Sequence, residues 1–133
     1  MIGLDSNILV RYIVQDDLQQ SELVNNYLEK NVTITSQGYI NSIVLCEIVW
    51  VLKRAYGYKK EIIVEVIAKI LQTKELIVEN SELALLTLKE YQKEQADFCD
   101  YFIAVINRDV DCKFTVTMDQ LAAKSKYFKL LTK

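Results

Sequence analysis

Five acidic residues stand at positions where their side chains could form a chemical site. Asp5 ends a short apolar run, Asp119 follows another after one residue, and Asp97 and Asp100 lie three residues apart where a helix is expected to begin. Glu47 lies within a run of apolar residues, so we expect it to be buried, which is costly for a lone carboxylate unless a cation neutralises it. Gathered in one place, these acids would repel one another, and a divalent cation would relieve that repulsion.

The residue types favour a hard metal ion. Oxygen ligands suit Mg²⁺ or Mn²⁺. The sequence contains no histidine, and Cys46, Cys99 and Cys112 form no CxxC pair. These facts exclude imidazole acid–base catalysis and argue against a zinc cage or a disulfide framework. A divalent ion can activate water for attack on a phosphodiester and stabilise the developing negative charge, so hydrolysis of such a bond is the chemistry that the acids favour.

Each acid also has a purely structural interpretation. Asp97 could cap a helix, with Asp100 as a favourable charge in its first turn. Asp119 could cap a short helix that follows it, and Asp5 could open the next helix in the same way. Glu47 could pair with a buried lysine or arginine. The five acids together, rather than any one of them, indicate a metal site.

An alternation of short strands and helices must position these acids. Helices are predicted from apolar spacing near 3.6 residues and from capping residues, and strands from short β-branched or apolar runs. The expected strands are 2–4, 32–35, 76–79, 113–117 and 128–131, and the expected helices are 6–14, 17–30, 39–56, 59–72, 80–95, 97–109 and 120–124. Strands separated by helices pair in parallel, which predicts an α/β domain of three layers, α/β/α. Sites in such folds lie beyond the carboxyl ends of the strands.

Composition limits the class of protein. The 133 residues suit one domain, 1–133. No apolar run approaches the roughly 20 residues of a membrane span, and the N-terminus has no signal-peptide pattern, so a cytoplasmic location is expected. The net charge is −2 and the pI about 5.2. Proteins that bind nucleic acid by charge alone are usually basic, so any such binding here needs local patches or a metal.

The acids also stand in the order of a known family. The opening LDSNILVRY, residues 4–12, resembles the first motif of PIN domains of the VapC toxin type, with Ser6 where threonine is usual. Glu47 resembles the second acid of that family. DFCDYFIA, residues 97–104, resembles the segment that carries the third acid, with Asp100 as the better match, and TMD, residues 117–119, resembles the end of the fourth strand.

This resemblance covers the chain from residue 2 to about 131 and implies a PIN-like fold with a roughly five-stranded parallel sheet. It implies an Mg²⁺- or Mn²⁺-dependent endoribonuclease that forms a homodimer, cuts RNA (tRNA being one candidate), and is blocked by a VapB-like antitoxin. Asp5 and Asp100 would hold the metal most directly, and Glu47 and Asp119 would orient water or a second ion. The full set that the resemblance assigns is the acidic pocket of Asp5, Glu47, Asp100 and Asp119, the further metal ligand Asp97, and the supporting residues Ser6, Asn7 and Thr117.

Basic and aromatic residues could supply RNA contacts. Arg11 follows Asp5 closely, and Lys53 and Arg54 stand in a basic stretch around Gly57. Arg11 could equally pair with a nearby acid, and single lysines more often belong to a solvated face. Tyr12 and Trp50 could stack on bases, although the core or a dimer interface is the preferred interpretation for both.

Two other functions remain open from the sequence. Asp5 at a strand end could be the nucleophile of an aspartyl-phosphate phosphoryl-transfer enzyme. Against this, the haloacid-dehalogenase-like pattern has a second aspartate where this chain has Asn7, and a receiver-like domain has paired acids near its first strand. A catalytically degenerate PIN fold acting as a binding module is the second alternative.

Overall fold

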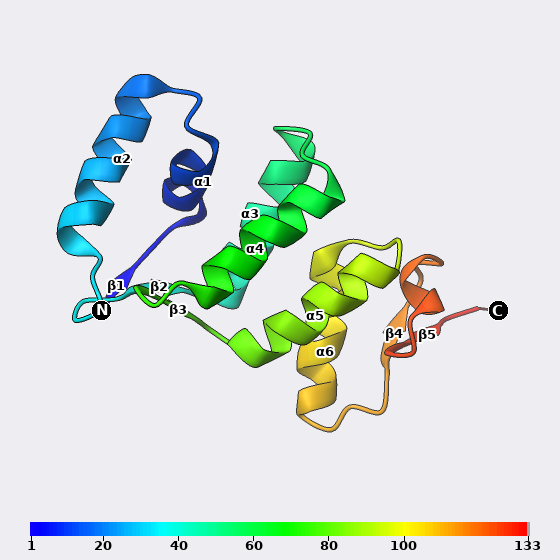
Figure 1. Ribbon diagram of the computed structural model, residues 1–133. Coiled ribbons are helices and arrows are strands. Elements are labelled where there is room, and N and C mark those ends of the chain that lie inside the picture. Colours follow the sequence, from blue (N-terminus) through cyan, green and yellow to red (C-terminus); the bar gives the residue numbers. More distant parts are fainter. Residues whose placement is uncertain (133) are drawn as a thin grey trace. The chain divides into compact units, whose positions relative to one another are not determined.

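The computed structural model describes residues 1–132, in which helices alternate with short strands (Figure 1). The strands are β1 (Ile2–Gly3), β2 (Gly38–Ile40), β3 (Leu76–Val78), β4 (Thr115–Thr117) and β5 (Phe128–Leu130). The helices are α1 (Ser6–Val14), α2 (Leu18–Asn31), α3 (Ser42–Arg54), α4 (Lys60–Gln72), α5 (Ser81–Lys93) and α6 (Phe98–Asp109), with the 3₁₀ turn η1 (Ala122–Lys124). Every strand pair in this part of the chain is parallel, which confirms the predicted α/β class. The five strands form a three-stranded and a two-stranded sheet.

The chain divides into two compact units, Met1–Ser81 and a second that begins at Glu82. The first contains the sheet in the order β1-β2-β3, with α1 packed on α2 and α3, and α4 packed on α3 and β3. Its core consists of aliphatic side chains that are fully buried, of which the largest are Ile40, Leu45, Ile48, Leu52, Ile63 and Ile67. Burial of each such side chain contributes about 1.5–3 kcal/mol.

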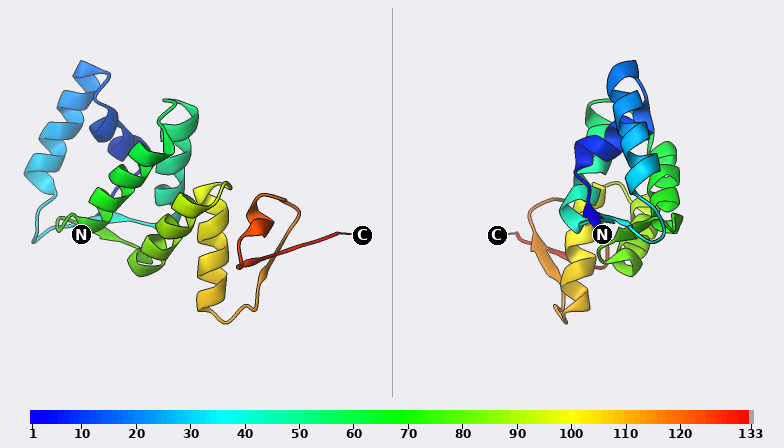
Figure 2. Two further views of the ribbon diagram at one scale, coloured as in Figure 1. Left: turned by 45° about the vertical axis from the view of Figure 1, so that its right-hand side comes forward. Right: turned by 90° about the vertical axis from the view of Figure 1, so that its left-hand side faces the viewer.

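The second unit contains nearly all of α5, then α6, η1 and the β4-β5 sheet. Figure 2 shows α6 followed by the β4 segment, with which it is in contact. Aromatic rings form its core: Phe98 lies 5.8 Å from Tyr91 and 5.5 Å from Phe102 between ring centroids. The Asn107 side-chain amide donates to Thr115 Oγ1 at 3.0 Å and ties β4 to α6.

The expected strand 32–35 is wrong. This segment forms a turn in which Thr33 and Ser36 exchange two backbone hydrogen bonds of 3.0 and 3.2 Å, and Thr33 Oγ1 accepts the Ser36 N–H at 3.1 Å. The second strand begins instead at Gly38, which is buried. A Cβ at this position would lie 2.6 Å from Leu4 Cδ1 and 3.1 Å from Leu76 Cδ2. A side chain at position 38 would therefore displace these two leucine side chains, a packing contact that β-branched propensity does not reveal.

The start of the expected helix 39–56 is also wrong, because residues 39 and 40 belong to β2. Asn41 separates strand from helix: its backbone is extended, and its side-chain oxygen accepts the Val44 N–H at 2.8 Å. Gly57 follows the helix with a φ of +66°, as its predicted role in ending the helix requires. The other expected elements are confirmed with ends shifted by at most two residues.

Candidate active site

Asp5 stands where β1 ends and α1 begins. Its backbone is extended, and its carboxylate accepts the N–H of Ser6 at 2.7 Å, so the expected structural role at the helix start is present. A carboxylate offers about four acceptor positions, and one hydrogen bond leaves most of them for a cation. The Asp5 side chain is exposed, as is that of Asn7 two residues further on, and both are therefore accessible to a ligand.

The start of α3 is fixed at the carboxyl ends of β2 and β3. Besides the cap by Asn41, a carboxylate oxygen of Glu79 accepts the backbone N–H of Ser42 at 2.8 Å. The Asn80 side chain donates to Ser42 Oγ at 3.1 Å. These contacts bind the first turn of the helix to the ends of two parallel strands, and so determine where the following turn, with Glu47, lies.

Glu47 is exposed, which corrects the expectation that this carboxylate is buried. The helix is apolar nearly all round, but only one of its faces is packed in the core, through Leu45, Ile48 and Leu52. The face with Glu47 also carries Ile43, which is 72% exposed. Within residues 1–132, Glu47 forms no ion pair with a lysine or arginine, so the alternative of a structural pair is not realised.

Asp97 and Asp100 lie at the beginning of α6. Asp97 occupies the N-cap position, but its side chain makes no capping hydrogen bond; its backbone carbonyl accepts the N–H of Asp100 at 3.1 Å. Partial burial raises the pKa of the Asp100 carboxyl above its ordinary value, and the charges of Asp97 and Asp119 raise it further. The purely structural interpretation of Asp97 as a side-chain cap is therefore not realised, and three acids of this unit interact.

Asp119 follows β4 and has a structural role as well as an electrostatic one. Its Oδ1 accepts the N–H groups of Leu121 at 2.8 Å and Ala122 at 3.2 Å. The predicted position of Asp119 as the cap of the short helix is wrong, because the N-cap position of η1 is Leu121, which makes no side-chain capping hydrogen bond. Its own N–H donates to Thr117 Oγ1 at 3.0 Å. The Thr117 hydroxyl thus positions the residue whose negative charge acts on Asp100.

The predicted acids fall into two groups. Asp5 and Glu47 belong to the first unit, and the interacting Asp97, Asp100 and Asp119 belong to the second. Over residues 1–132, no three histidine, cysteine or acidic side chains are already arranged to hold a metal ion. The donor chemistry of the second group nevertheless fits a hard divalent cation, since every donor is a carboxylate oxygen and their mutual repulsion is what such a cation offsets.

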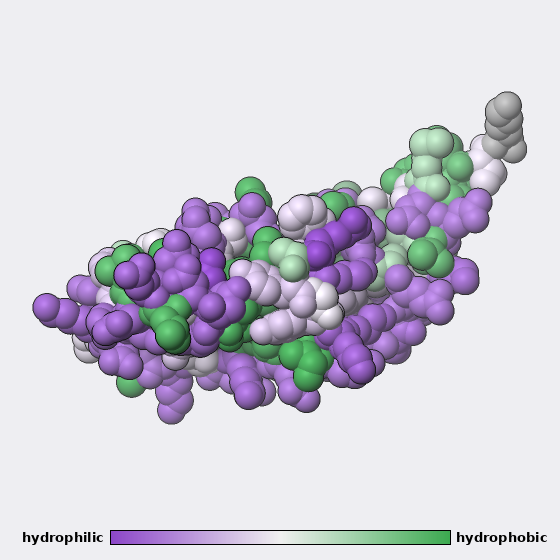
Figure 3. Space-filling model, turned by 90° about the horizontal axis from the view of Figure 1, so that it is seen from above, coloured by the Kyte–Doolittle hydropathy of each residue, from purple (hydrophilic) through white to green (hydrophobic). Residues whose placement is uncertain are grey.

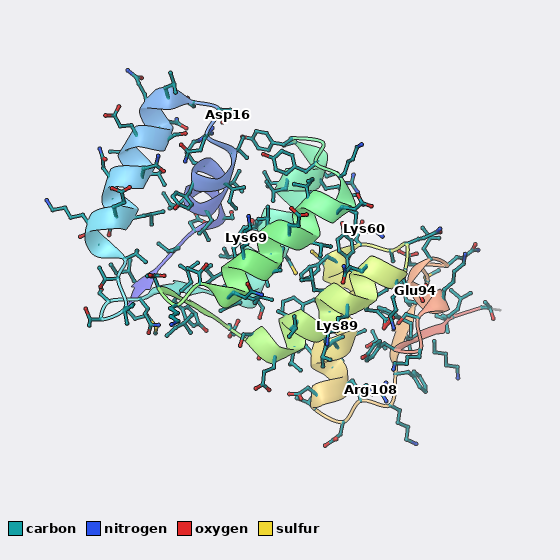
Figure 4. All side chains as sticks on the ribbon, in the orientation of Figure 1. Asp16, Lys60, Lys69, Lys89, Glu94 and Arg108 are labelled. Atoms are coloured by element: carbon teal, nitrogen blue, oxygen red, sulfur yellow. The ribbon has the colours of Figure 1, made fainter. Side chains whose placement is uncertain are left out.

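Two predicted contact residues have partners within the chain. Arg11 forms an ion pair with Asp16, which lies in the link between α1 and α2 (Figure 4). This is the alternative that the sequence left open for Arg11. The guanidinium of Arg54 lies over the Trp50 ring, 6.0 Å from its centroid. Trp50 is 55% exposed and Tyr12 50% exposed, so neither belongs to the core.

A cavity of about 350 Å³ lies in the first unit. Its lining is mostly apolar: Leu4, Leu9, Tyr12, Leu28, Glu29, Val32, Thr73, Glu75 and Leu76. None of the five predicted acids lines it. The acids of this unit are instead on its accessible surface.

Comparison with known proteins identifies the family. The model of the PIN domain matches residues 2–124, nearly the whole chain. The protein therefore belongs to the PIN domain family, whose members are generally metal-dependent nucleases. No curated protein and no solved structure gave a significant match. None of the helices in residues 1–132 has the length and hydrophobicity needed to cross a bilayer.

Proposed function

We propose that this PIN-domain protein is an Mg²⁺- or Mn²⁺-dependent endoribonuclease and acts as the toxin of a VapBC-type toxin–antitoxin system. The observation that carries the nuclease proposal is the match to the PIN domain over residues 2–124. The grouping of three acids supports it, because burial, and then the charges of Asp97 and Asp119, raise the pKa of the Asp100 carboxyl. Such repulsion between acids destabilises an empty site and favours a bound cation. In a chain of the PIN family, this electrostatic arrangement supports nuclease chemistry.

By the resemblance of the motifs to those of PIN domains, Asp5, Asp97, Asp100 and Asp119 would hold the ion, with Asp5 and Asp100 as its most direct ligands. When bound, the ion supplies charge stabilisation to the phosphodiester and makes water more acidic. A carboxylate oxygen of Glu47 would orient the attacking water and accept its proton. This carboxylate is exposed and forms no ion pair within residues 1–132, which suits that role.

The supporting residues act through the acids. The N–H of Ser6 holds the Asp5 carboxylate, and the hydroxyl of Thr117 holds the backbone of Asp119. Asn7, exposed beside Asp5, positions water or a ligand. RNA contacts come from Lys53 and Arg54 at the end of α3 and from Arg11 when its pair with Asp16 opens.

The toxin assignment rests on the motifs. The compact length of the chain, the VRY continuation of the first motif at residues 10–12 and the DFCD segment at residues 97–100 resemble those of VapC-type toxins. The proposal includes a cytoplasmic homodimer built from a single domain, 1–133, a structured RNA target such as tRNA, and a VapB-like antitoxin that covers the acidic groove. Light scattering of the purified protein tests the dimer, and co-expression with the product of an adjacent small reading frame tests the antitoxin.

Cleavage of RNA by the purified protein tests the catalytic proposal. We expect cleavage with Mg²⁺ or Mn²⁺ that stops on addition of EDTA. Asp5→Asn and Asp100→Asn should each abolish it while circular dichroism shows a folded chain. Asp109→Asn, at the other end of α6, is the matched control and should cut like the wild type. If Asp5→Asn and Asp100→Asn retain wild-type cutting, the proposed site is wrong.

Further measurements separate the alternatives. Radiolabel trapped on Asp5 from a phosphate donor would indicate aspartyl-phosphate transfer instead, and RNA bound but never cut would indicate a binding module. Sequencing RNA ends after induction of the wild type and of Asp5→Asn identifies the target.

A further inference from the structure

One face of α3 carries four side chains in a single row. Ile43, Glu47, Trp50 and Arg54 follow one another at spacings of four, three and four residues, which places them on the same side of the helix. Ile43 is 72% exposed and Trp50 is 55% exposed. We call these four residues the α3 row.

Trp50 and Arg54 form a pair at the C-terminal end of this row. The guanidinium carbon of Arg54 lies 6.0 Å from the centre of the Trp50 ring. Stacking uses the flat face of a guanidinium and leaves its N–H groups, which lie at the edge, available for a phosphate. An indole that is half exposed can meanwhile accept a nucleobase on its free surface, since every base has a π-face.

The position of this pair relative to Glu47 suggests its use. On a helix, residues three apart have Cβ atoms about 5–6 Å apart, so the Trp50 side chain stands directly beside the Glu47 side chain. We propose that Trp50 and Arg54 bind one unpaired nucleotide of the RNA substrate next to the bond that is cut. The base stacks on Trp50 and Arg54 donates hydrogen bonds to the phosphate of the same nucleotide. This inference rests on the proposed ribonuclease function.

Charge favours RNA over a protein partner on the α3 row. The cores of protein interfaces are depleted in charged residues, whereas this row places the charged Glu47 between Ile43 and Trp50 and ends with Arg54. The apolar side chains visible in Figure 3 likewise form small separate patches on a largely hydrophilic surface. With a net charge of −2, the chain also needs a local cationic group to attract a polyanion.

The subsite selects an unpaired nucleotide rather than a particular base. Stacking on an aromatic ring is tolerant of base identity, and only a base that has left its helix can present its face. Cleavage should therefore fall in loops or single-stranded segments of a structured RNA.

Fluorescence reports directly on this contact, because Trp50 is the only tryptophan of the protein. Binding of a short single-stranded RNA to the Asp5→Asn protein should quench this fluorescence and shield the ring from acrylamide. An RNA with an abasic nucleotide at the stacked position should bind without quenching. An unchanged Trp50 signal at saturating RNA would overturn the subsite.

Binding of labelled RNA, followed by anisotropy, measures the contribution of each residue. Trp50→Ala should raise the dissociation constant roughly 5- to 150-fold, the range found for loss of one stacked base, and Trp50→Phe should retain most of the affinity. Arg54→Ala should weaken binding and Arg54→Lys should restore part of it. Two control variants remove exposed groups elsewhere in the same unit: the ring of Tyr27 on α2, by Tyr27→Ala, and the charge of Lys69 on α4 (Figure 4), by Lys69→Ala. Both should leave the dissociation constant for RNA unchanged.

The outcomes separate the two proposals. If the wild type cuts RNA but Trp50→Ala binds and cuts equally well, the subsite is wrong and the ribonuclease function stands. If the wild type fails to cut RNA with any divalent ion while Trp50 still stacks on it, the catalytic proposal is wrong and the nucleotide site stands. Light scattering of Trp50→Ala tests a third outcome. If the mass of this variant falls to that of a monomer while its RNA binding is unchanged, the α3 row is an interface between copies of the chain. That result would overturn the nucleotide subsite.

Discussion

Replacement of Gly38 by alanine tests how the first sheet supports Asp5. Gly38 is a buried residue of the middle strand, and an added Cβ would lie 2.6 Å from Leu4 Cδ1 and 3.1 Å from Leu76 Cδ2. Leu4 is itself only 6% exposed and immediately precedes Asp5. The new methyl group must therefore displace a packed side chain next to a proposed metal ligand.

The size of the effect follows from these distances. Carbon atoms in contact are normally about 3.5–4.0 Å apart, so the methyl group overlaps Leu4 by about 1 Å. Insertion of a methyl group into a packed core costs about 1–3 kcal/mol. The loss of unfolded-state entropy on replacing glycine by alanine returns about 0.4–1 kcal/mol. The middle of each range leaves a net destabilisation of about 1.3 kcal/mol. This lowers the Tm of a chain of this length by roughly 5 °C.

Thermal and urea unfolding followed by circular dichroism measure this change. Gly3→Ala in the adjacent strand is the matched control, because a Cβ at Gly3 meets nothing within 4 Å. Gly3→Ala should be as stable as the wild type or slightly more stable. The urea midpoint of Gly38→Ala should fall, with no change in the slope of its unfolding free energy against urea concentration. RNA cleavage at a temperature where both variants are folded should fall only for Gly38→Ala. Equal Tm values for the two variants would refute the packing account.

Two further predictions concern the proposed site. Because burial and neighbouring charges raise the pKa of Asp100 in the folded state, its protonation stabilises the metal-free protein. This contribution is complete below the ordinary pKa of 3.8 and disappears as the pH rises through the raised value. Asp100→Asn should therefore raise the Tm of the metal-free protein at pH 7 and remove this pH dependence. Mg²⁺ should stabilise this variant less than it stabilises the wild type. Identical Tm profiles of the variant and the wild type from pH 4 to 7.5 would contradict the prediction. Asn41→Ala removes the acceptor of the Val44 N–H and should lower the free energy of unfolding in urea by about 0.5–2 kcal/mol. Asn41→Ser should retain most of the stability. An unaltered urea midpoint for Asn41→Ala would argue against the cap.

Local signals in the sequence determined most helices and the immediate setting of several acids. The span of α1 agrees with the predicted 6–14 at both ends, because Asp5 caps its first turn and the apolar spacing continues to Val14. The end of α3 before Gly57 was predicted in the same way. Capping and periodicity act within one turn of the chain, so neighbouring residues suffice to reveal them.

Tertiary contacts decided the features of the fold and of the candidate site that these local signals do not reveal. The second strand lies at Gly38–Ile40 rather than in the β-branched run before it, because this is the segment that pairs with β1 and β3. Gly38 packs so closely there that a Cβ would lie 2.6 Å from Leu4 Cδ1. Glu47 is exposed because the core of the first unit covers one face of an apolar helix and leaves the other uncovered. The pKa of the Asp100 carboxyl is raised by burial first, and then by the charges of Asp97 and of Asp119, which lies 19 positions further along the chain. These features depend on distances between segments remote in sequence, and such distances are set by packing rather than by local propensity.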